Sequence, residues 1–299
     1  MNNRGQKTGV AGLVLGLFLL ISCAGFQSER TTPEILSLDQ AVAHIGGELF
    51  GRVAHRDSKG AMVALDRFVN AESGEVPVSA PRIEEILLQQ AQGRFQALRV
   101  DRLNPESQAK ARYLVTGTVT PEPGNIDGKS LYRLGASLTD LKADRVLLHA
   151  EARFAEADFD VSPTALYRDN PFFDPNYQKK KIPGEAPRRA SPPPAVEYSV
   201  QTLALLREAS DAYERKAYRQ SLALFEQAAD RPDGQTLWTY AGLYLVCEQL
   251  GRTESADQAF EKILSISVAR YRMLTVRFLF QVDSVEFWDS DRNEERYRN

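Results

Sequence analysis

The chain has 299 residues and a mass of 33.4 kDa, enough for about two domains. Its charged fraction (26 %) and hydrophobic fraction (43 %) are ordinary for globular protein, which excludes wholesale disorder. A formal net charge of −3 lacks the basic excess of nucleic-acid-binding proteins, so no nucleic-acid partner is predicted. Two cysteines and three histidines exclude a disulfide framework and predict neither a metal site nor a cofactor.

The N-terminus has the pattern of a secretory signal. The basic residues Arg4 and Lys7 precede an apolar stretch over 10–21, and the small residue Ser22 comes directly before Cys23. Twelve apolar residues are too few to span a bilayer, which takes about 20. Residues 1–22 are therefore predicted to be a signal peptide.

The stretch Leu20-Ile21-Ser22-Cys23 resembles the lipobox of bacterial lipoproteins. The resemblance implies cleavage between Ser22 and Cys23 and acylation of Cys23, and Ala24 implies sorting to the outer membrane. Several acyl chains anchor a protein firmly, so the membrane is a predicted partner. The alternative is a plain signal peptide with a chance cysteine.

Residues 23–33 are predicted to be a polar tether, and residues 34–160 are predicted to form an α+β domain. Alternating apolar and polar residues indicate a sheet with one solvated face, so the helices should lie on one face of a mixed sheet. The third strand is expected to end before Pro121, since proline interrupts the ladder. The predicted elements are a helix over 35–49, a strand over 62–69, a helix from the N-cap Ser79 to Gly93, and strands over 95–103, 113–119, 131–141 and 146–154.

No catalytic residue is predicted. His44 falls in the first predicted helix, His55 in a loop and His149 on the polar face of a strand. In each of these three places a histidine is seldom catalytic. The pairs Glu84/Glu85 and Glu294/Glu295 are adjacent in sequence and cannot face each other on a helix. They are interpreted as solvated charges and not as catalytic pairs.

Several stretches within 38–157 carry a family resemblance: Leu65 to Gly74, Arg82-Ile83-Glu84, Tyr113 to Gly117 and Tyr132 to Leu138. This region resembles the periplasmic domain shared by lipoprotein activators of penicillin-binding proteins and the curli-secretion lipoprotein. The resemblance implies a domain that binds partner proteins and performs no chemistry.

Residues 161–198 are predicted to be a linker, because eight of the 15 prolines fall there and exclude regular elements. Its basic runs, Lys179 to Lys181 and Arg188-Arg189, are interpreted as solvated charge. The alternative is contact with anionic lipid or a cell-wall polymer.

Residues 199–270 are predicted to be all-α, and two stretches in them match. One begins at Ser221 and the other at Ala256, 35 residues later, which is close to the tetratricopeptide period of 34. The segment resembles a pair of tetratricopeptide helical hairpins; a generic helical bundle is the alternative. The predicted packing residues are Ser221, Phe225, Trp238, Ala256 and Phe260. Cys247, in an apolar helix, is predicted to be a buried thiol.

Residues 271–299 contain an alternating strand pattern from Leu274 to Val282. This resembles the opening strand of the peptidoglycan-binding domain of OmpA-family proteins, of which only a truncated start is present. The resemblance implies attachment to peptidoglycan in any full-length form.

Together these features predict an outer-membrane lipoprotein that faces the periplasm and acts as a non-catalytic adaptor for envelope proteins. One alternative is an oligomeric component of envelope secretion or assembly. A second is an enzyme of cell-wall turnover, which would need a nucleophile with its base or a carboxylate pair.

Overall fold

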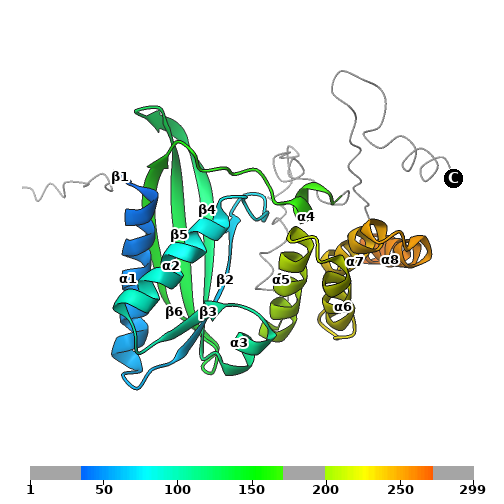
Figure 1. Ribbon diagram of the computed structural model, residues 1–299, viewed down its shortest axis with the longest axis horizontal. Helices are drawn as coiled ribbons and strands as arrows, with labels where there is room; N and C mark the ends of the chain where they lie inside the picture. The colour runs from blue at the N-terminus through cyan, green and yellow to red at the C-terminus, as the bar shows by residue number, and fades with distance from the viewer. Residues whose placement is uncertain (1–34, 171–198, 272–299) are drawn as a thin grey trace, which may run out of the picture. The chain divides into compact units, whose positions relative to one another are not determined.

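The structure is a computed structural model that describes residues 35–170 and 199–271 (Figure 1). A mixed sheet with its helices is followed by a helical region, which confirms the predicted fold class. The elements are β1 (Ile35–Leu36), α1 (Leu38–Arg56), β2 (Met62–Asn70), α2 (Ala80–Arg94), β3 (Arg99–Arg102), α3 (Pro105–Lys110), β4 (Tyr113–Ile126), β5 (Lys129–Asp140), β6 (Arg145–Glu156), α4 (Ala165–Arg168), α5 (Val200–Glu214), α6 (Tyr218–Ala229), α7 (Leu237–Gln249), α8 (Thr253–Ile266) and a π-helical turn (Ser267–Tyr271).

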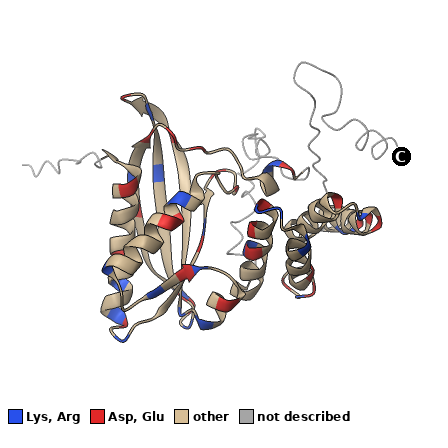
Figure 2. Ribbon diagram, in the orientation of Figure 1, with Lys and Arg blue, Asp and Glu red and all other residues tan. Residues whose placement is uncertain are grey.

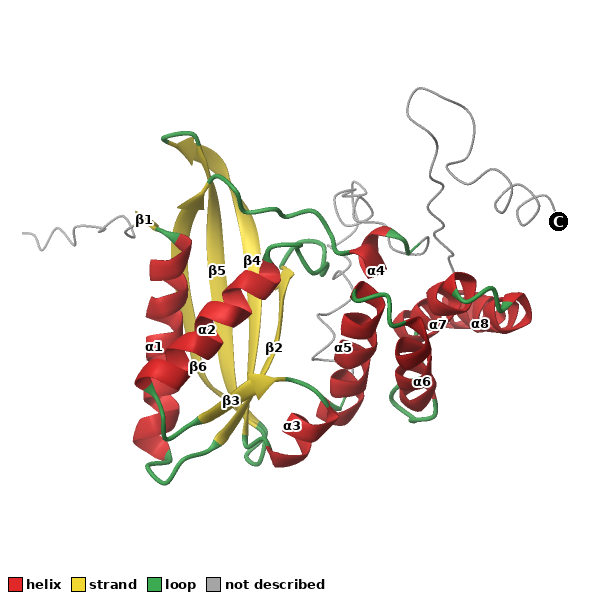
Figure 3. Ribbon diagram, viewed as in Figure 1, coloured by secondary structure: helices red, strands yellow, loops and turns green. Residues whose placement is uncertain are grey.

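The sheet has six strands in the order β1-β6-β5-β4-β2-β3. Strands β4, β5 and β6 form an antiparallel meander, while β2 is parallel to both of its neighbours and β1 is parallel to β6. Helices α1 and α2 cover one face (Figure 3), where their apolar side chains join those of the strands in the main core. On the other face, Ala64 and Leu114 pack against Leu203 and Ala204 of α5.

The first helix begins later than predicted. Ser37 is its N-cap and forms a capping box with Gln40, so the helix cannot extend back through Ile35. Instead, Ile35–Leu36 pairs with Arg153 and Phe154 of β6. The helix also runs further, to Arg56, which places His55 in its last turn and not in a loop.

Strand β4 passes through two prolines and contradicts the predicted end before Pro121. Pro121 pairs with Tyr132 of β5, and Pro123 lies in a register shift between Glu122 and Asn125. The pairing of β4 with β2 ends at Val119, so the strand beyond this point has a neighbour on one side only. A missing N–H is tolerated on such a free edge.

Two local predictions around the helices were wrong. Ser79 precedes α2, but its hydroxyl accepts a hydrogen bond from the backbone of Asp160 and does not cap the helix. Strand β3 is shorter than the predicted 95–103, because Asn104 begins α3 through a capping box with Ser107. The sequence signal for α3 was an asparagine followed by proline, which is a common helix start.

The first residues of the predicted linker 161–198 form regular structure. Thr164 donates its backbone N–H to Val76, and the short helix α4 follows with Leu166 and Tyr167 buried. The basic runs and the proline run of the linker lie outside the described residues.

We expect Gly117→Ala to destabilise the fold. A Cβ at Gly117 would lie 2.1 Å from the ring of Phe68, which is buried opposite it on β2. Because a packed core yields little to added volume, the free energy of unfolding should fall by about 1–3 kcal/mol in urea titrations. Gly93→Ala is the control, since a Cβ there meets nothing within 4 Å and alanine favours helix α2. Equal destabilisation by both variants would contradict the packing argument.

Candidate functional site: an ion-pair cluster beside a cavity

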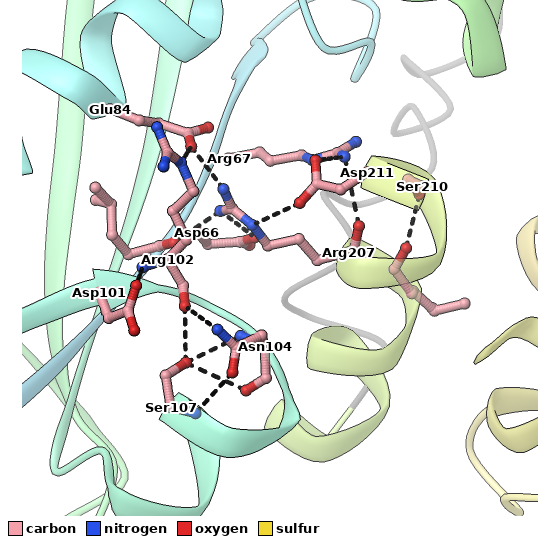
Figure 4. A network of polar contacts seen from close by, with 12 residues as sticks. Asp66, Arg67, Glu84, Asp101, Arg102, Asn104, Ser107, Arg207, Ser210 and Asp211 are labelled. Atoms are coloured by element: carbon pink, nitrogen blue, oxygen red, sulfur yellow. Dashed lines mark hydrogen bonds and ion pairs between the residues drawn. The ribbon is translucent and has the colours of Figure 1, made fainter. Parts of the chain in front are cut away.

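Charged residues from four elements meet between the sheet domain and the helical region. They are Asp66 and Arg67 of β2, Glu84 of α2, Arg102 of β3, and Arg207 and Asp211 of α5, named here the Arg207 cluster (Figure 4). Charged positions also mark α2, β3 and α5 along the ribbon (Figure 2). A register shift of β2 between Leu65 and Phe68 brings Asp66 and Arg67 to this place.

Arg207 is the centre of the cluster, with a side chain only 2 % exposed. Its Nη2 donates to Glu84 Oε2 at 2.6 Å, and its Nη1 donates to the carbonyl of Leu65 at 2.7 Å. Its Nη1 also lies 3.6 Å from a carboxylate oxygen of Asp66, and its Nε lies 3.7 Å from Asp211. One guanidinium therefore ties α5 to both α2 and β2.

The flanking pairs extend this connection. Arg67 forms an ion pair with Asp211 and also donates to the carbonyl of Arg207 at 3.4 Å. Arg102 Nε donates to Glu84 at 3.0 Å, and its Nη2 reaches Glu85 at 3.3 Å. Glu84 thus accepts hydrogen bonds from two arginines, which satisfies a carboxylate that is only 4 % exposed.

This geometry corrects the interpretation of Glu84 as a solvated charge. Glu85 is exposed, as predicted, but Glu84 faces inward and is buried. Its main partner, Arg207, is 123 residues away in sequence, so no local pattern could indicate the pairing. Without a partner, a buried carboxylate would cost several kcal/mol.

The environment of the cluster shifts the pKa values of Asp66 and Arg67. Burial raises the pKa of the Asp66 carboxyl above its usual value, against the opposing effect of the Arg207 guanidinium. Burial by itself would lower the pKa of Arg67, but the adjoining Asp211 carboxylate raises it above the usual value, so the guanidinium stays charged. The charges of the cluster are therefore engaged with one another.

A second polar group fixes the start of α5. Ser199 donates its backbone N–H to Asp233 at 2.7 Å, and the Thr202 hydroxyl donates to the other carboxylate oxygen at 2.8 Å. Burial by itself would raise the pKa of the Asp233 carboxyl, but these hydrogen bonds lower it to about 2. The first turn of α5 is thus tied to the loop before α7.

A cavity of about 270 Å³ lies beside the Arg207 cluster, between the sheet and α5. Strand alternation places the side chains of Thr116, Thr118, Ser137 and His149 on one face of β4, β5 and β6, and they form the polar side of the cavity. The other sides include Leu203 and Leu206 of α5, Tyr167 of α4 and Trp238 of α7. We name it the sheet–α5 cavity.

His149 connects two polar side chains at this cavity. Its Nδ1 lies 3.0 Å from Ser137 Oγ and its Nε2 lies 3.0 Å from Glu151 Oε1, in a serine–histidine–glutamate order. A nucleophilic serine also needs N–H donors for the developing oxyanion. Ser137 lies in β5, which is paired on both sides at this point, with Thr116 and with His149, so the backbone N–H groups there belong to the ladder.

The sequence predicted that His149 lies on the polar face of a strand. It did not predict the two side chains that His149 contacts. Ser137 lies directly opposite it on β5, and Glu151 is two residues further along β6. His44, on α1, is exposed and faces Glu48 one turn later. Among residues 35–170 and 199–271, no three His, Cys, Asp or Glu side chains are grouped as a metal site would require.

The predicted lipidation and cleavage residues, Cys23 and Ser22, lie outside the described residues. In the part of the chain that the structure describes, no helix is both long and apolar enough to cross a membrane. Cys247 is buried in α7, as predicted, and burial raises the pKa of its thiol. The strand predicted over 274–282 also falls outside the described residues.

The residues predicted to pack the two repeats lie in the consecutive helices α6, α7 and α8. Ser221 and Ala256 are fully buried, and Ser221 Oγ donates to the carbonyl of Ala209 at 2.7 Å. The buried ring of Phe225 occupies the space that a side chain at Gly242 would need. The matching ring, Phe260, is partly buried with its centroid 6.2 Å from that of Tyr244. The ring of Trp238 lies against that of Tyr167, with centroids 4.6 Å apart and a tilt of 30° between the planes. The assignment of these hairpins as tetratricopeptide repeats stays a prediction.

Comparison with known proteins finds similarity to solved structures. No protein-family profile and no curated protein matches the chain. Among solved structures, the LpoB C-terminal domain from Salmonella enterica matches with 12 % identity and a TM-score of 0.27, covering 40 % of this chain and 98 % of that domain. The LpoB C-terminal domain from Escherichia coli matches with 11 % identity and a TM-score of 0.26, over the same shares of each chain.

We expect the Arg207–Glu84 pair to behave as one unit in a double-mutant cycle. Arg207→Leu leaves Glu84 buried without its main partner and should lower the free energy of unfolding by about 3–5 kcal/mol. Adding Glu84→Leu should restore part of the loss, measured by urea titration. Lys110→Ala, which breaks an exposed ion pair with Glu106, should change stability by less than about 1 kcal/mol. Strict additivity of the two leucine variants would contradict the coupling.

We expect Asp233→Asn to remove a pH-dependent part of the stability. A carboxyl with a lowered pKa stabilises the fold above its unfolded-state pKa of 3.8 and loses this contribution as the pH falls toward 2. Because Asp233 is partly exposed, the loss at pH 7 should be about 1 kcal/mol, and the variant and the parent should converge near pH 2. Unfolding midpoints from pH 7 to pH 2 measure the difference. Asp144→Asn, in an exposed turn, should leave the profile unchanged.

Proposed function

We propose that this protein is an outer-membrane-anchored lipoprotein that faces the periplasm and acts as a non-catalytic adaptor for other envelope proteins. The observation that carries the proposal is the lipobox-like stretch ending at Cys23, placed directly after a short apolar segment. An acylated N-terminal cysteine gives attachment to a membrane without a spanning helix. Ala24, the residue after it, supports the outer membrane as the destination.

The use of charged and nucleophilic residues supports an adaptor over an enzyme. The carboxylates and guanidinium groups of the Arg207 cluster are paired with one another and hold α5 against the sheet. Ser137 lies on β5, which is paired on both sides at this point, so its backbone groups belong to the sheet. The charged residues of the cluster thus hold the fold together, and Ser137 lacks free backbone N–H groups for an oxyanion.

The arrangement of the two regions supports protein binding. Because the Arg207 cluster joins α5 to α2 and β2, a partner that contacts both the sheet domain and the helical hairpins meets them in a fixed arrangement. The resemblance of 38–157 to activators of penicillin-binding proteins makes those enzymes the first partners to test. In any longer form of the chain, the OmpA-like segment after residue 271 would add attachment to peptidoglycan.

We expect Cys23→Ala to abolish both acylation and membrane attachment. The parent chain, expressed in a Gram-negative host fed labelled palmitate, should carry the label and sediment with outer membranes. The variant should carry no label and appear in the soluble periplasmic fraction.

The matched control is Cys247→Ala, which removes the other cysteine of the chain. Its thiol is buried in α7, so this variant should stay labelled and membrane-bound. A Cys23→Ala chain that still sediments with membranes would refute the anchor. Hydrolysis of purified cell walls by the full chain would refute the non-catalytic role.

A further inference from the structure

We propose that the sheet–α5 cavity binds a small neutral sugar ring. The site is independent of lipid anchoring, and nothing in the adaptor role requires it. Its size, its lack of free charge and the division of its surface into a hydroxyl-bearing side and an apolar side together indicate this ligand class.

The volume limits the ligand to about one ring. Pockets for drug-sized ligands measure roughly 300–1,000 Å³. The cavity, at about 270 Å³, lies just below that range and accommodates one six-membered ring with its substituents.

The charges at the cavity are paired, which favours a neutral ligand. Arg67 lines the cavity but is held by Asp211, and Arg207 is held by Glu84 and Asp66. An ionic ligand would have to compete with these short contacts inside the protein and would lose its hydration as well.

The polar side offers hydroxyl groups in a compact array. Thr116 and Ser137 are paired across β4 and β5, and Thr118 lies opposite Gly135. Because Gly135 has no side chain, the space between Thr118 and His149 stays open; a Cβ there would lie 3.2 Å from Thr118 Oγ1. The hydroxyl groups of Thr116 and Thr118, beside the bonded pair of Ser137 and His149, match a ligand with several hydroxyl groups around one ring.

The opposite side is apolar and partly aromatic. Leu203 and Leu206 of α5 line it, and the tilted rings of Tyr167 and Trp238 add aromatic surface. A pyranose ring has hydroxyl groups at its edge and C–H groups on its face, so it can satisfy both sides at once. A purely apolar ligand would offer no hydrogen-bond partner to the hydroxyl groups of Thr116 and Thr118.

Trp238 provides a direct measurement because it lines the cavity. The second tryptophan, Trp288, is changed to phenylalanine to leave one fluorophore, in the full acylated chain purified in a detergent without sugar groups. Glucose and N-acetylglucosamine are titrated separately. We expect a saturable change in fluorescence with a midpoint of about 1 mM, the weak affinity of a single small ring. No saturable change with either sugar up to about 100 mM would overturn the proposal.

Isosteric variants test whether the hydroxyl groups are the recognition elements. Thr116→Val with Thr118→Val keeps the shape of the cavity and should weaken sugar binding about tenfold. Thr139→Val, on the same face of β5 but outside the cavity, should bind as the parent does. If the double variant does not fold, Ser137→Ala tests the same side. Unchanged affinity in folded cavity variants would overturn the assignment.

Two further titrants test the ligand class. Glucuronate, which adds a carboxylate to the same ring, should bind at least about tenfold more weakly than glucose because no charge at the cavity is free to pair with it. Phenol should not bind more tightly than the sugars. Preference for glucuronate or for phenol would overturn a neutral sugar site and would assign the cavity to an anion or to an aromatic ring.

Discussion

The buried contact between Arg207 and Glu84 is the interaction on which the arrangement of this protein depends. It joins residues 123 positions apart, from a helix of the sheet domain and the first helix of the helical region, with both side chains almost fully buried. Such a pair is costly to form and more costly to break, because removing either partner leaves an unpaired charge out of water. The guanidinium of Arg207 also contacts the carbonyl of Leu65 and the carboxylate of Asp211. These contacts fix its orientation toward Glu84.

The same contact explains why the second face of the sheet has two different parts, one covered and one polar. Helix α5 covers the strands β2 and β4 through Ala64 and Leu114, so this part of the second face is closed by apolar packing. Further along the sheet, β5 and β6 present Ser137, His149 and other polar side chains. The sheet–α5 cavity lies where the covered part gives way to the polar part, which is why one side of it bears hydroxyl groups and the other is apolar.

A protein anchored by its N-terminus benefits from a firm link between its binding surfaces. The proposed adaptor role requires the helical hairpins and the sheet domain to meet a partner in a consistent arrangement. The ion pairs fix the orientation of α5 on the sheet domain. The small apolar cluster of Ala64, Leu203 and Ala204 excludes water beside them. The buried thiol of Cys247 is consistent with this division of roles, because the cysteine proposed for lipidation is the other one, at position 23.

The sequence by itself determined the features that depend on neighbouring residues: strands β2, β5 and β6 nearly to their ends, and the helical region with its buried Ser221, Phe225 and Ala256. Apolar periodicity and turn residues are local, so they can be recognised along the chain. The tertiary structure alone decided the extension of β4 through Pro121 and Pro123, the burial of Glu84, and the cavity. Each of these depends on what the rest of the fold places beside a residue: a free strand edge, the guanidinium of Arg207, and a helix packed over the polar face of the sheet.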